Sequence, residues 1–183
     1  FQPDLVWVKN RSATDSNVLT DAVRGATKII SSDATSAEST DADTVTAFES
    51  DGFALGDDDK VNTSSENFVA WQWLAGNSSG STNDDGSVDS TVTANTTAGF
   101  SICKFNPGGN SNITFGHGLG TAPRLVLVKN LEDATNWQVL HLDQGVGNKL
   151  FLNTTAAAAS DTNMWQNTAP TSSVVSVGTS QTT

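Results

Sequence analysis

The sequence predicts an all-β protein made of antiparallel β-sandwich modules in tandem, of the jelly-roll or lectin-like kind. Three observations carry this prediction. Short β-branched and aromatic runs alternate with Gly, Asn and Asp turns, as in sandwiches. Charged residues are only 16% of the 183-residue chain, against roughly 25% in an average globular domain. The stretch PDLVWVKN at 3–10 also returns as PRLVLVKN at 123–130.

The internal repeat extends beyond this stretch, with small insertions. A period near 120 residues is too long for a solenoid, whose units run roughly 20–50 residues, and fits tandem globular modules. The later matches are Gly25 with Gly145, 27–29 with 148–150, and GFALG at 52–56 with VVSVG at 174–178.

The phase of the repeat divides the chain into two incomplete modules. The first, 1–76, lacks its opening strands, and the second, 99–183, lacks its closing strands. Between them, 77–98 is rich in Gly, Ser, Asn and Asp and reads as a linker or a loose hairpin. Since the chain starts at Phe1 without Met or a visible signal peptide, we expect a fragment or processed product with further modules on both sides.

The strongest strands are LVWV and LVLV inside the repeated stretch. Both faces of each are apolar, which predicts central strands, and a Pro precedes each run, where a strand tolerates it. A further strand is FVAWQWLAG at 68–76, with Val69, Trp71 and Trp73 on one face.

Three hairpins follow from the turn residues. The first is 44–56, with its turn at Asp51-Gly52. The second is 100–116, where FSICKF, the turn NPGGN and ITFG follow one another. The third pairs 137–145 with 149–153. Only the Ala run at 156–159 suggests helix, of one turn at most.

Composition and motifs argue against several function classes. The net charge of −11 would repel a phosphate backbone, so nucleic acid is not expected as a partner. No apolar run is long enough for membrane insertion. Cys103 lies in an apolar stretch and reads as a buried, inert thiol. His117 and His141 read as structural histidines. The sequence contains no nucleophile elbow and shows no pair of carboxylates suited to glycoside cleavage. We therefore expect no enzyme and no cofactor.

One loop has the spacing of a cation site. Asn83, Asp85 and Asp89 could offer oxygen ligands to a hard cation such as calcium. The complete twelve-residue calcium-loop pattern is absent. The alternative is a solvated turn that pivots at Asp85-Gly86.

Two tryptophans are candidates for saccharide contact. Trp137 and Trp165 are flanked by polar residues, among them Asn136 and Asn163. A flat indole face beside amide groups suits a sugar ring and its hydroxyls. Trp7, Trp71 and Trp73 lie on strands and are expected to pack in the core.

The succession of motifs resembles a known family. PDLVWVKNR, VRGATK, DGFALG, FVAWQWLAG, GFSI and GHGLGTAPRLVLVKN are similar to the tandem β-sandwich modules of unknown function in virion proteins of marine, cyanophage-like tailed phages. The resemblance covers nearly the whole chain and implies a building block of a tail fibre or of a capsid or tail appendage, located in the virion. Its motifs are structural and carry over no catalytic residue.

We therefore expect a non-enzymatic structural module of a phage virion. Its partners would be other copies of the same chain, in a trimer or another symmetric bundle, and other virion proteins. The alternative is a lectin-like module that binds host surface polysaccharide. A polysaccharide depolymerase is a third possibility and requires a carboxylate pair in a groove.

Overall fold

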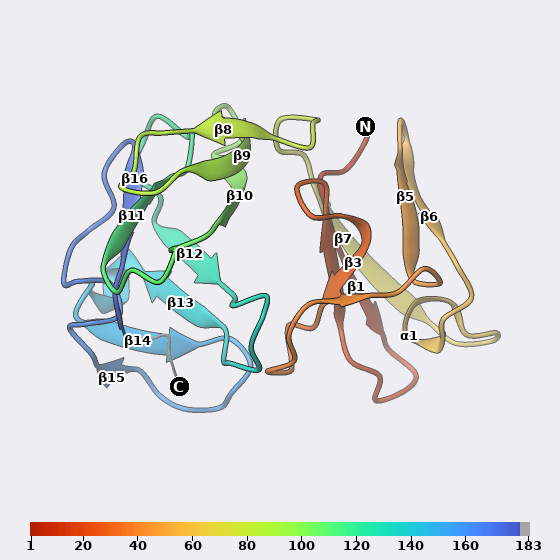
Figure 1. Ribbon diagram of the computed structural model, residues 1–183. Coiled ribbons are helices and arrows are strands. Elements are labelled where there is room, and N and C mark those ends of the chain that lie inside the picture. Colours follow the sequence, from red (N-terminus) through yellow and green to blue (C-terminus); the bar gives the residue numbers. More distant parts are fainter. Residues whose placement is uncertain (180–183) are drawn as a thin grey trace.

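A computed structural model describes residues 1–179 of the chain and confirms the all-β, antiparallel sandwich class. The elements lie in two lobes, β1–β7 and β8–β16 (Figure 1). The first lobe contains β1 (Leu5–Asn10), β2 (Val18–Asp21), β3 (Gly25–Ile30), β4 (Ser39–Thr40), β5 (Val45–Glu49), β6 (Gly52–Leu55), α1 (Asp59–Asn62) and β7 (Phe68–Trp73). The second contains β8 (Ser81–Asn83), β9 (Ser90–Asn95), β10 (Phe100–Phe105), β11 (Ile113–Gly116), β12 (Leu125–Val128), β13 (Gln138–His141), η1 (Leu142–Gln144), β14 (Asn148–Phe151), β15 (Ala159–Ser160) and β16 (Val174–Val177). Within residues 1–179, no helix has the length and apolar character that a membrane crossing requires.

The first lobe is built on a five-stranded sheet in the order β4-β3-β2-β1-β7. Side chains alternate between its faces, so Val6 and Val8 of β1 point to one face, where both are fully buried. The β5–β6 hairpin and α1 supply Val45 and Val61 to the same apolar cluster. This face is the core of the first lobe.

The second lobe repeats this plan with a four-stranded sheet, β12-β13-β14-β15. Its core contains Leu140 from that sheet, Phe115 from β11 and Trp165, which is fully buried. The sheet β10-β9-β8 packs from the side through Phe105, whose ring stacks on Phe115 at 4.2 Å between centroids. The two VKN segments thus lie in different sheets, each with its own apolar cluster.

Equivalent backbone hydrogen bonds recur in both lobes at matched positions. The amide of Asp41 donates to Thr27 at 2.9 Å, and that of Asp161 donates to Gly147 at 2.8 Å. The structure thus matches Thr27 with Gly147, one residue away from the sequence alignment of 27–29 with 148–150. Further on, Gly56 and Gly178 donate to Thr44 and Met164 respectively, both at 2.8 Å. The repeat read in the sequence is therefore also a repeat of strand order, β1–β4 against β12–β15, and of connections.

The repeated Lys-Asn pair closes the loop that leaves each first strand. The Asn10 side-chain oxygen accepts from the Ser12 amide at 2.9 Å, and the Asn130 oxygen accepts from the Glu132 amide at 2.8 Å. Such side-chain-to-backbone turns are the favoured use of Asn after a strand. Lys9 Nζ also donates across its loop to the Asp15 carbonyl at 2.7 Å.

Four local predictions need correction or refinement. Residues 100–116 do not form a hairpin, because β10 pairs with β9 and β11 pairs with β16. The Ala run at 156–159 is not helical, and its last residue belongs to β15. LVWV is central, between β2 and β7, but LVLV is not: within residues 1–179, β12 pairs with β13 alone. The segment 77–98 contains β8 and β9, which pair with each other and extend a sheet with β10.

The outer face of the first sheet contacts the second lobe through β1, β2 and β3, while Trp71 of β7 on the same face stays 46% exposed. Leu19 and Ile30 from this face form an apolar cluster with Trp137. The Trp137 Nε1 donates to the Ser31 carbonyl at 2.7 Å, and the Glu38 amide donates to the Leu131 carbonyl at 2.9 Å. The lobes are therefore joined by a packed and hydrogen-bonded contact, here called the junction, and not only by the chain between them.

We expect Gly178→Ala to lower the free energy of unfolding by about 1–3 kcal/mol, as overpacking does. The added Cβ would lie 1.8 Å from the Asn163 carbonyl oxygen, which is backbone and cannot rotate away. Chemical denaturation measures the loss. Gly52→Ala is the matched control, because its Cβ meets nothing within 4 Å; an equal loss in both variants would contradict the close-approach explanation.

Candidate functional site

The predicted saccharide residues are not on an open surface. Trp137 is 4% exposed and lies in the junction, and Trp165 is 0% exposed in the core of the second lobe. Neither indole face can stack on a sugar ring, so the prediction for these two rings is wrong. The half-buried Asn136 accepts from Asn153 Nδ2 at 2.9 Å, and the exposed Asn163 lies in the turn that passes over Gly178.

The predicted cation ligands are placed in a turn between β8 and β9. The Asn83 side-chain oxygen accepts from the Asp85 amide at 3.1 Å, and Asn83 Nδ2 donates to Asp85 Oδ2, also at 3.1 Å. These two side chains satisfy each other, and Asp89 is exposed. In the part of the chain that the structure describes, no group of three or more His, Cys, Asp or Glu side chains is arranged to hold a metal ion.

His117 is 2% exposed and is fixed as a neutral imidazole by its neighbours. Its Nδ1 accepts from the Leu119 amide at 3.2 Å, so Nε2 carries the proton and faces the Thr171 carbonyl at 3.3 Å. Burial lowers the pKa of this histidine. Burial likewise raises the pKa of the Cys103 thiol to about 11, so the thiolate that reactivity requires is scarce at neutral pH.

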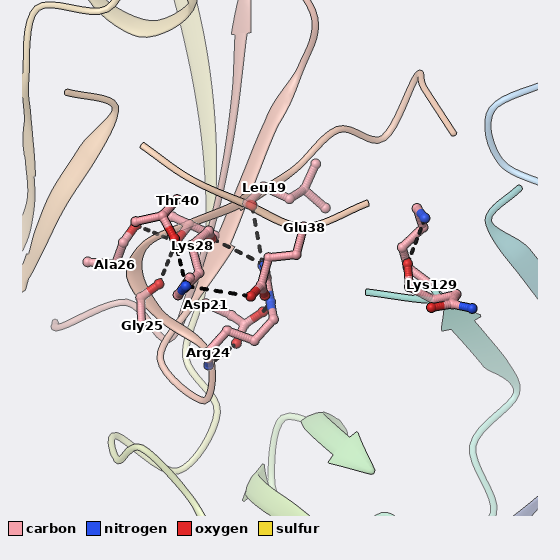
Figure 2. A network of polar contacts seen from close by, with 11 residues as sticks. Leu19, Asp21, Arg24, Gly25, Ala26, Lys28, Glu38, Thr40 and Lys129 are labelled. Carbon is pink, nitrogen blue, oxygen red and sulfur yellow. Dashed lines mark hydrogen bonds and ion pairs between the residues drawn. The ribbon is translucent and has the colours of Figure 1, made fainter. Parts of the chain in front are cut away.

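A largely buried network of charged side chains surrounds Arg24 in the first lobe (Figure 2). The Arg24 side chain is 5% exposed, and its Nε lies 2.6 Å from Asp21 Oδ2. Its Nη1 contacts Glu38 Oε2 at 3.2 Å and donates to the Lys28 carbonyl, also at 3.2 Å. Nη2 donates to the Leu19 carbonyl at 3.3 Å, so each nitrogen of the guanidinium has a partner within the protein. The network ties the β2–β3 turn to the segment that enters β4 and reads as structural.

A cleft at the junction combines features that the other candidates lack. It has a volume of about 630 Å³ and is formed by equivalent loops of the two lobes, 32–33 and 152–155, together with the strand β1. The lining combines an indole, two amides, a carboxylate and hydroxyls, and its surface is more apolar than polar. The lining residues are Trp7, Asn17, Ser32, Asp33, Leu152, Asn153, Thr154 and Thr155.

Two polar atoms in the cleft wall are buried without a hydrogen-bond partner. They are Trp7 Nε1, a donor, and Asn17 Oδ1, an acceptor. Burying such atoms unsatisfied costs free energy, and native proteins seldom do it without a water or ligand nearby. The half-buried Trp7 ring also contacts Trp71, at 5.7 Å between centroids, and Trp71 is 46% exposed at the edge strand β7.

The loops that line the cleft are held by matched capping bonds. The Asn17 amide donates to Asp33 Oδ1 at 3.0 Å, and the Trp137 amide donates to Asn153 Oδ1 at 2.9 Å. These pairs stand at equivalent positions of the two repeats. The cleft could not be predicted from either module alone, because its lining comes from both. The available signal was the alignment of 17 with 137 and of 33 with 153.

Comparison with known proteins identifies a family. A family model described as "Domain of unknown function (DUF7483)" matches residues 1–183. Comparison with curated proteins and with solved structures gave no match.

We expect stability to fall as the pH drops below about 6.5, the ordinary pKa of histidine. The folded chain holds His117 neutral, so the unfolded chain binds this proton more readily and acid favours unfolding. Denaturant titrations at several values between about pH 7 and pH 5.5, above the range in which exposed carboxylates titrate, measure the slope. His117→Asn should flatten it; an unchanged slope in this variant would assign the effect to other groups.

Proposed function

The chain belongs to the DUF7483 domain family, and we propose that it is a non-enzymatic structural repeat module of a phage virion, in a tail fibre or in a capsid or tail appendage. One observation carries the proposal: two equivalent sandwiches are joined by a packed junction instead of a loose linker. A module that lengthens a fibre must transmit its orientation to the next module, and a packed contact does this where a flexible chain cannot.

The contacts of the junction support a fixed orientation of the lobes. Trp137, 4% exposed, brings a large apolar surface against Leu19 and Ile30. Its hydrogen bond to the Ser31 carbonyl fixes the direction of the ring as well as its depth. A ring held by packing on its faces and by a directional bond at its edge has little freedom to slide.

The composition of the surface fits a particle protein that assembles with copies of itself and with other virion proteins. The net charge of −11 favours solubility before assembly. Hydroxyl- and amide-bearing side chains cover much of the exposed surface and can form hydrogen bonds between chains in a symmetric bundle, such as a trimer.

The test of the virion role is the location of the protein. Antibodies raised against the purified chain should label a fibre or an appendage in electron micrographs of the phage particles. Mass spectrometry of purified particles should detect its peptides in stoichiometric amounts. Particles that lack the protein, while infected cells contain it, would refute the virion role.

A second candidate function is saccharide binding, and the cleft at the junction favours it. Trp7 offers part of an indole face, while Asp33, Asn17 and the threonines at 154 and 155 offer groups that bind hydroxyls. The exposed Trp71 beside Trp7 extends the aromatic surface outward. The ligand class would be the host surface polysaccharide that a fibre meets.

For this second function, we expect saturable binding of oligosaccharides from the host surface, measured on a glycan array and by tryptophan fluorescence. Asp33→Ala and Trp7→Phe should weaken binding by about tenfold, since losing one hydrogen bond or stacking contact costs about 1–1.5 kcal/mol. Asp84→Ala, an exposed carboxylate outside the lining, is the matched control. Binding that is absent, or equal in all variants, would leave the structural function alone.

A further inference from the structure

The two lobes differ at one place where their sequences predict the same structure. The strand β1 is covered on both edges, by β2 and by β7, whereas β12 pairs with β13 only, within residues 1–179. On β12, Leu125 is 54% exposed and Leu127 is 40% exposed. From this difference, and resting on the proposed structural function, we propose that the open edge of β12 pairs with a strand that has the pattern of β7. A further copy of the repeat supplies this strand, which also covers the outer face of the β12 sheet.

The outer faces of the two sheets are equivalent residue by residue, but only one is covered. On the first sheet this face is apolar and packs against the second lobe through Trp137, Leu131 and Leu152. On the second sheet the matching face is apolar too, and register places its side chains together. The matched residues are Leu5 with Leu125, Trp7 with Leu127, Leu19 with Val139, and Ile30 with Leu150.

The first lobe shows what occupies the open edge. Strand β7 runs antiparallel to β1 with Trp73 opposite Leu5 and Trp71 opposite Trp7. Cross-strand aromatic and aliphatic neighbours of this kind stabilise a sheet. The same strand on β12 would set its two tryptophans opposite Leu125 and Leu127. An edge strand with exposed leucines is otherwise a site for unwanted association.

The last strand of the repeat also differs between the lobes, and here the exposed strand is in the first lobe. In the second lobe β16 pairs with β11, with Val177 opposite Ile113, and Val177 is 5% exposed. The matching strand of the first lobe is β6, which within residues 1–179 pairs with β5 alone, and its Leu55 is 38% exposed. Each of these two strands has one partner, but the partner differs: β16 pairs with β11, which precedes the repeated stretch of its lobe, whereas β6 pairs with β5 and leaves Leu55 exposed. The edge of β6 is therefore a second place where a neighbouring copy of the repeat could add a strand.

A symmetric dimer through β12 is disfavoured by charge. If two copies paired antiparallel along LVLV, Arg124 of one copy would stand near Lys129 of the other. Both are cations, and like charges on facing strands destabilise the pair. A β7-type strand, by contrast, brings no charged residue to the positions opposite LVLV, since FVAWQW contains none.

The test uses a longer protein in which the chain is followed by a second copy of most of its own sequence. Gly56 and Gly178 are equivalent, so a chain of residues 1–178 followed directly by a second copy of 57–183 sets a β7 strand and a further lobe after β16. Hydrogen exchange is then compared between this extended chain and the 183-residue chain. We expect exchange in the peptide that spans 124–129 to slow at least about tenfold in the extended chain, as a new strand pairing requires.

Leu127→Asp gives the second measurement. It should destabilise the extended chain by about 2 kcal/mol more than the 183-residue chain, since only the former buries this side chain, a difference of about thirtyfold in the unfolding equilibrium. Lys104→Asp, on the exposed side of β10, should have equal effects in both lengths.

Two results would overturn the proposal. One is exchange at 124–129 that is equally fast in both lengths. The other is sedimentation of the 183-residue chain as a dimer that Leu127→Asp dissociates, which would assign the surface to a symmetric copy. Because both measurements use purified protein, they fail or succeed independently of whether the protein is found in virions.

Discussion

The arrangement of the molecule depends on burying both faces of the first sheet. Its strand β1 alternates fully buried valines on one face with Leu5 and Trp7 on the other, so a single hydrophobic core satisfies only half of it. The second half is satisfied by Trp137 and its neighbours from the next lobe. The junction is therefore a consequence of the strand's own composition. It brings equivalent loops of the two lobes together and creates the cleft between them.

The fold class was predictable because it depends on local patterns. Strand periodicity and the Asn and Gly turns are visible in windows of ten residues, and the repeat is visible when two such windows, 3–10 and 123–130, are compared. The structure follows these patterns closely at β1–β4 and β12–β15. The neighbours of a strand are a different matter. LVWV and LVLV have the same alternation, yet one is central and the other is at an edge. LVWV pairs with β2 on one side and β7 on the other, whereas LVLV pairs with β13 alone within residues 1–179.

The predicted sites failed for the same physical reason. Trp137 stands among polar residues in the sequence and looked exposed, but its partner Ser31 lies 106 positions away. NPGGN has strong turn chemistry, yet ITFG does not return onto FSICKF, since its partner β16 comes about sixty residues later. Flanking residues report on the local backbone, whereas burial is decided by contacts that are remote in sequence. Trp7 and Asp33 line the cleft together with Asn153, and nothing in the sequence around them predicts that these three residues are neighbours.

The side-chain closure of the loops after β1 and β12 explains how two diverged copies keep one shape. In both loops the Asn oxygen holds the amide two positions ahead, while the residues between and beyond differ freely, as in Arg11-Ser12 against Leu131-Glu132. The side-chain amide of one Asn sets the shape of the loop, and the other residues of the loop need not be the same. The loop after β12 can therefore bring Leu131 into the apolar contact between the lobes, where the loop after β1 has Arg11, and both loops keep the same turn.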